Sequence, residues 1–239
     1  MMNSLCGSDD AGIYSVADNF AFLLSLITNG INSSLTPHIY QCIKRNKTDQ
    51  LKQQTTFVVL GVAILTLGMI CFIPDIFVIM LPKSYYPALK VIPPVAVGAF
   101  FLFLYPLFGS IEFYYQENKY VTYASVIGAA LNVGLNYIFI RLCGFVAAAY
   151  TTLICYLCFS VCHYLFMSKV LKKSNKKNDI YDIKAIFLIS AGLISLSLIM
   201  LCLYDHMIIR WGCIFIMITG VLLKRKQFIC LISSLKKKG

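Results

Sequence analysis

Charged residues are scarce in this sequence, and acidic residues are the scarcest of them. Asp, Glu, Lys and Arg together make up 13% of the 239 residues, and only 10 residues are acidic. A soluble domain carries about a quarter charged residues, because its surface faces water. Hydrophobic residues make up 59% of the chain, and the mean hydropathy is +0.77. This composition excludes a soluble enzyme and predicts an integral membrane protein.

Groups that carry catalysis or bind metals are also few. The three histidines, His38, His163 and His206, lie in different parts of the chain, and none stands at helical spacing from another metal ligand. Asp9 and Asp10 belong to a polar segment before the first apolar run, and the sequence has no glycine-rich phosphate-binding loop. We therefore predict that the chain is not an enzyme and holds no metal ion or other cofactor.

Long apolar runs occupy most of the chain. A helix of about 20 apolar residues crosses the hydrocarbon core of a bilayer, and runs of about that length or longer recur between short polar segments. The sequence predicts an all-α, polytopic membrane helix bundle with about seven transmembrane helices, at residues 12–42, 54–81, 88–115, 120–141, 144–169, 183–204 and 207–223.

Prolines are concentrated in the third of these runs. Pro93, Pro94 and Pro106 each lack a backbone N–H and remove a hydrogen bond from a helix interior. We therefore expect this helix to be bent. A bent helix beside a cavity is common in transporters, and a kinked helix with a purely structural role is the equal alternative.

Lysine and arginine, 21 residues in all, are concentrated between the apolar runs. If the seven spans alternate in direction, seventeen of these residues fall on one side of the membrane and four on the other, namely Lys83, Lys90, Arg141 and Arg210. Cytoplasmic loops are enriched in Lys and Arg, so the N-terminus is predicted outside and the C-terminus in the cytoplasm. Because the basic residues follow the loops in this way, we predict no nucleic-acid binding.

The spans and the basic loops define the predicted order of segments. These are a polar extracytoplasmic N-terminus (1–11), five transmembrane helices (12–169), a basic cytoplasmic linker (170–182), a terminal helix pair (183–223) and a basic cytoplasmic tail (224–239). A signal sequence needs a basic segment followed by an apolar one. The N-terminal segment has neither, so we expect further helices to precede this chain in the complete protein.

Polar residues inside the spans are candidates for a translocation pathway, because such groups are costly in a membrane. Hydrogen bonding between helices is the alternative interpretation, and it is favoured for the asparagines. For Asp18 and Glu112 the pathway interpretation is favoured, because hydrogen bonding between helices seldom needs a full charge. The candidates are Asp18, Asn29, Asn32, Glu112, Asn132 and Asn136.

Several stretches resemble segments of a known family. Residues 11–17 (AGIYSVA) resemble the A-G-x-Y-S-x-A segment that opens a helix in bacterial oligosaccharide flippases, and residues 86–98 are similar to a later segment. Residues 130–140 (ALNVGLNYIFI), with Gly144 and residues 147–152 (AAAYTT), resemble two consecutive helices of Wzx-type polysaccharide exporters. The chain thus resembles the C-terminal portion of a polysaccharide biosynthesis protein of the MATE-like superfamily.

This resemblance implies a fold and a function. Such proteins have about fourteen helices, arranged as two lobes around a central cavity plus a terminal pair, and this chain resembles the second lobe and the pair. The implied function is the flipping of undecaprenyl-diphosphate-linked oligosaccharide across the bacterial inner membrane, for O-antigen, capsule or exopolysaccharide synthesis. The implied partners are the lipid-linked oligosaccharide, bilayer lipids and the missing N-terminal lobe, with a polysaccharide polymerase or glycosyltransferases as further candidates.

Three points qualify the implied function. Residues 141–143 (RLC) depart from the family, which often has a proline before the glycine. No Lys or Arg lies deep in a span, so charges that bind the diphosphate would belong to the missing lobe. The alternatives are a cation-coupled multidrug exporter of the same superfamily, which Asp18 and Glu112 favour, and an inactive truncated product or membrane scaffold.

Overall fold

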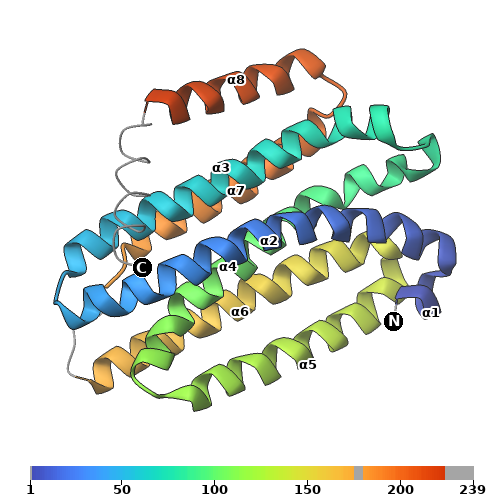
Figure 1. The fold of residues 1–239 in the computed structure, drawn as a ribbon. Coiled ribbons are helices and arrows are strands. Elements are labelled where there is room, and N and C mark those ends of the chain that lie inside the picture. Colours follow the sequence, from blue (N-terminus) through green and yellow to red (C-terminus); the bar gives the residue numbers. More distant parts are fainter. Residues whose placement is uncertain (1, 175–179, 224–239) are drawn as a thin grey trace.

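The structure is a computed structural model that describes residues 2–174 and 180–223, and these residues are almost entirely helical (Figure 1). The elements are α1 (Met2–Cys6), α2 (Ser8–Lys44), α3 (Thr48–Met80), the 3-10 helix η1 (Lys83–Lys90), α4 (Ile92–Tyr114), α5 (Asn118–Cys143), α6 (Phe145–Lys173), α7 (Ile183–Cys202) and α8 (Met207–Leu223).

Six of these helices, α2 to α7, are long and apolar enough to cross a membrane, and α8 is a shorter apolar helix of 17 residues. No strand occurs in the part of the chain that the structure describes. The prediction of an all-α, polytopic membrane helix bundle is confirmed. The predicted basic tail at 224–239 lies outside the described residues.

Two connections set the geometry of the helices that they join. Gly144 alone joins α5 to α6, and its φ of +71° is a conformation that residues with a side chain rarely adopt. The tight turn therefore forms without a proline before this glycine. Asp182 caps α7, because its carboxylate accepts a hydrogen bond from the backbone N–H of Ala185 at 3.0 Å.

The predicted third span is divided into two elements. Its first residues belong to η1, and α4 begins only at Ile92. Pro93 and Pro94 therefore lie in the first turn of α4, where a missing N–H costs no hydrogen bond. These two prolines start the helix and do not interrupt it, so they remove no hydrogen bond from its interior. Pro106 lies in the helix interior, as predicted.

The centre of the bundle is α4, which packs against α2, α6, α7 and α3 (Figure 1). Its side chains are buried along most of its length, and Phe100 and Phe103 are among the largest fully buried side chains. The same core continues through buried residues of α7 and α8. These two helices, at 183–223, each pack against α3 and so extend the bundle.

The segment predicted as a basic linker, 170–182, is partly built into the bundle. Its first residues complete α6, and residues 175–179 lie outside the described residues. Tyr181 is buried, and its hydroxyl donates a hydrogen bond to the carbonyl oxygen of Leu107 at 2.9 Å. The end of this segment therefore ties α7 to α4.

In contrast to α4, helix α5 lies at the edge of the bundle. It packs mainly against α6, and almost none of its apolar stretch is buried (Figure 1). Helix α2 packs on α4 and lies apart from α5, so a gap lined by three helices opens between α2, α5 and α6.

Candidate functional site: a polar groove between α2, α5 and α6

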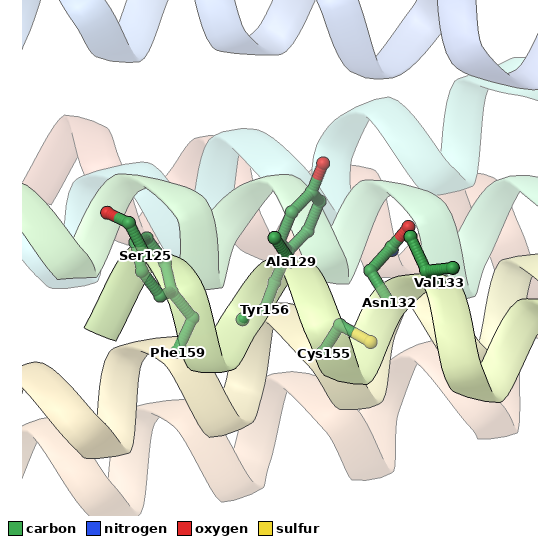
Figure 2. Close-up of a pocket in the computed structure, with 8 residues that line it drawn as sticks. Ser125, Ala129, Asn132, Val133, Cys155, Tyr156 and Phe159 are labelled. Carbon is green, nitrogen blue, oxygen red and sulfur yellow. The ribbon is translucent and has the colours of Figure 1, made fainter. Parts of the chain in front are cut away.

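Three cavities that share lining residues lie at this edge of the bundle. They have volumes of about 410 Å³ between α2, α4 and α6, about 290 Å³ between α2, α5 and α6, and about 370 Å³ between α5 and α6. Tyr156 lines all three cavities. In Figure 2 Tyr156 and Phe159, from α6, lie beside the α5 residues Ser125 and Asn132. We call this surface the polar groove.

Helical periodicity places the lining residues on matching faces. Residues three, four or seven positions apart share a face of a helix. On α6 these are Thr152, Tyr156 and Phe159, on α5 they are Ser125, Asn132 and Asn136, and on α2 they are Tyr14, Asp18, Phe22 and Ser25. The amides, hydroxyls and aromatic rings of the groove thus come from three helices, and apolar residues such as Val133 of α5 and Leu102 of α4 complete its lining.

The asparagines both line the groove and join its walls. The Asn136 amide donates a hydrogen bond to Oδ1 of Asn132 at 3.1 Å, and the Thr151 hydroxyl of α6 donates to Oδ1 of Asn136. Both asparagines also line the cavity between α2, α5 and α6. In this structure hydrogen bonding between helices and lining of a pathway are therefore compatible roles.

Asp18 is exposed, and it lines the two cavities that α2 borders. Tyr156 lines both of these cavities with it, and Tyr14 lines the one between α2, α5 and α6. Among the described residues, no Lys or Arg forms an ion pair with it. Asp18 therefore brings to the groove a carboxyl group that no Lys or Arg of the described residues pairs with.

The remaining candidates from the sequence lie outside the groove. Asn32 is buried, and its amide donates a hydrogen bond to the Phe103 carbonyl at 3.3 Å, which links α2 to α4. Asn29 is exposed on α2 and lines none of the three cavities. The structure thus brings Asp18, Asn132 and Asn136 together and separates Asn29, Asn32 and Glu112 from them.

Glu112 belongs to a second, closed site between α4 and α6. Its Oε1 lies 2.9 Å from Nδ1 of His163, and both side chains are fully buried. The rings of Tyr105 and Phe159 lie 5.3 and 4.7 Å from the His163 ring, between ring centroids. Oε2 of Glu112 and Nε2 of His163 have no hydrogen-bond partner among the described residues.

The sequence did not identify this pair, because its members lie 51 positions apart on different helices. The signal available was that Glu112 and His163 each lie within a predicted apolar span. Ionisable groups buried in a span find partners on other helices. Helical spacing within one span, however, cannot identify the residue on another helix that pairs with Glu112.

Arg210 is a further ionisable residue inside the bundle. Its side chain is buried, and its guanidinium donates hydrogen bonds to both carboxylate oxygens of Asp75, at 2.9 and 3.1 Å, and to the Cys71 carbonyl at 3.0 Å. The pair fastens the start of α8 to α3. Arg210 is therefore paired within the bundle.

The long apolar helices indicate a multi-pass membrane protein, and polar side chains line cavities among these helices. The MatE family model matches residues 1–138, which reach from α1 into α5. The chain belongs to the MatE family, whose members are transporters of the MATE superfamily and not enzymes. No match was found among curated proteins or among solved structures.

Proposed function

We propose that this chain takes part in flipping undecaprenyl-diphosphate-linked oligosaccharide across the bacterial inner membrane, for O-antigen, capsule or exopolysaccharide synthesis. The observation that carries the proposal is the lining of the polar groove. Amide, hydroxyl and aromatic groups from α2, α5 and α6 meet there, with Asp18 as the one charged residue among the described lining residues.

This lining suits the chemistry of a sugar. Sugar hydroxyls need donors and acceptors when they leave water, and Asn132 and Asn136 offer both. The C–H faces of a sugar ring pack well on aromatic rings such as Tyr156. Amides exposed to lipid would instead be costly. The groove therefore suits an oligosaccharide, while the polyprenyl tail of the substrate stays in the hydrocarbon of the bilayer.

The groove forms one wall of a transport cavity in this proposal. Alternating access needs two bundles that rock against each other around a central site, and α2, α5 and α6 supply a single face. The N-terminal lobe that we expect from the sequence would supply the opposite face and the cations that bind the diphosphate. The N-terminus lies outside and the C-terminus in the cytoplasm, as the distribution of Lys and Arg indicates.

A cation-coupled multidrug exporter is the second candidate. Asp18 favours it, because an exposed carboxylate in a groove attracts cationic compounds or a coupling ion. The buried Glu112–His163 pair adds a second ionisable group between two spans. Against it stands the separation of Glu112 from the groove, which leaves no compact carboxylate cluster at Asp18 among the described residues.

Deletion of the reading frame in its own bacterium tests these candidates. We expect loss of the surface polysaccharide and accumulation of lipid-linked oligosaccharide in the inner leaflet, both reversed by the intact chain and reversed poorly by the Asn132→Ala variant. An intact polysaccharide with a new sensitivity to cationic drugs would support the exporter instead. A deletion without either effect would indicate an inactive product or a scaffold.

A further inference from the structure

We propose that the polar groove selects glycans by charge, accepting neutral and cationic sugars and rejecting anionic ones, with Asp18 as the selecting residue. This inference rests on the proposed function, since it names the kind of glycan that the groove takes. It also assigns Tyr156 as the surface on which the sugar packs, wherever the sugar lies along the groove.

The charge of the groove is the first argument. Of the described residues that line its three cavities, Asp18 alone is charged, and it lines the cavities of about 410 and 290 Å³. The other polar lining residues are amides and hydroxyls, which bind neutral and charged sugars alike. A carboxylate on the sugar would face Asp18 in a membrane-embedded groove, where charges interact more strongly than in bulk water.

No Lys or Arg of the described residues lines a cavity together with Asp18. Arg210 is held by Asp75 and by the Cys71 carbonyl on the far side of the bundle core. The Arg141 guanidinium lies over the Tyr137 ring, 4.1 Å from its centroid, and lines none of the three cavities. An anionic sugar thus finds no positive partner among the described residues of the groove.

Tyr156 is the residue that the three cavities share. It lies on α6 where the three cavities join, and it lines each of them. Asp18 and Thr152 share two of these cavities with it. A sugar that moves along the groove therefore stays in contact with the Tyr156 ring and passes Asp18 on the way.

Three trisaccharides of equal length test the proposal. The N-acetylglucosamine trimer is neutral, the glucosamine trimer carries basic amino groups, and trigalacturonate is anionic at the pH of 7 used for all three. Binding of each to the full chain in nanodiscs of uncharged lipid is measured by saturation-transfer NMR. We expect the neutral and cationic trimers to bind at least tenfold more tightly than trigalacturonate.

Variants separate the role of Asp18 from that of the groove as a whole. Asp18→Asn should bring the ratio of the affinities for the neutral trimer and for trigalacturonate below threefold, chiefly because trigalacturonate binds more tightly. Asp9→Asn is the matched control, because Asp9 is an exposed carboxylate of the same helix that lines none of the cavities. Tyr156→Ala should weaken all three ligands at least fivefold, whereas Tyr156→Phe should retain binding.

The outcomes distinguish this inference from the proposed function. Tighter binding of trigalacturonate, or an unchanged ratio in Asp18→Asn, overturns charge selection and leaves glycan flipping in place. Binding of none of the three trimers to a chain that is folded and monodisperse overturns both. A loss of polysaccharide on deletion, together with the expected order of affinities, supports both.

Discussion

The polar groove and the Glu112–His163 site are built from the same kinds of residue and lie in opposite environments. Asp18 is exposed beside Tyr156 in an open groove at the edge of the bundle. Glu112 is sealed between α4 and α6, where its contact is a histidine. A carboxylate in an apolar span is therefore not by itself a sign of a pathway, because the neighbouring helices decide whether water and substrate reach it.

The largest effect on stability is expected in the sealed site. Glu112→Ala removes the hydrogen-bond partner of buried His163, and we expect the free energy of unfolding to fall by about 3 kcal/mol. The measurement is unfolding in detergent, with Asn29→Ala as the control because Asn29 is exposed on α2. The double variant Glu112→Met and His163→Leu should recover much of the loss, since apolar side chains of similar size can replace a buried polar pair.

An unchanged stability of Glu112→Ala would contradict the purely structural role of the Glu112–His163 pair. If Glu112→Ala unfolds like the unaltered chain but fails to restore polysaccharide in the deletion strain, the sealed pair acts in transport.

A somewhat smaller and more local effect is expected at α8. Asp75→Ala leaves the buried Arg210 guanidinium without its carboxylate, and we expect a loss of about 2 kcal/mol in the attachment of α8 to α3. Hydrogen exchange should rise in α8 while α4 stays protected. Uniform exchange across the bundle would show that the pair supports the whole core.

In the groove we expect little change in stability and a large change in transport. Asn136→Ala removes hydrogen bonds to Asn132 and Thr151 in a part-buried position, which should cost about 1 kcal/mol. Surface polysaccharide in the complemented strain should fall severalfold. A stable variant with full polysaccharide would mean that Asn136 only joins α5 to α6.

The smallest effect on the free energy of unfolding is expected at Glu117, in the turn before α5 and outside the spans. Glu117 accepts a hydrogen bond from the Lys173 ammonium group, and its Oε2 lies 3.3 Å from Nζ of Lys119. These two cations lower the pKa of the Glu117 carboxyl group, Lys173 the more strongly. A lowered pKa in the folded state stabilises the protein above the ordinary pKa near 4.5, and the gain is lost as the pH falls through the lowered value. Glu117→Gln should therefore unfold slightly more easily at pH 7 and no differently near pH 2. A difference that persists at low pH would refute this account.

The sequence was sufficient for most of the helices, although it did not predict η1 or the start of α4. Residues 120–141 and 183–204 were predicted as spans, and the structure has α5 at Asn118–Cys143 and α7 at Ile183–Cys202. The physical reason is that the bilayer requires apolar segments of a set length whose backbone groups are satisfied within the helix. Periodicity within a helix also identified residues that share a face, such as Asn132 and Asn136.

Only the tertiary structure decided which helices bring polar residues together. Glu112 lies 51 positions from His163, and Asp75 lies 135 positions from Arg210. Asp18 and Tyr156 line one groove because α2 and α5 both flank α6 there. Periodicity shows the face of a single helix, whereas such contacts depend on the packing and register of several. The sequence by itself therefore determined that this protein is a bundle of membrane-spanning helices with polar residues inside them. The packing decided which of these residues line the open groove and which are closed within the core.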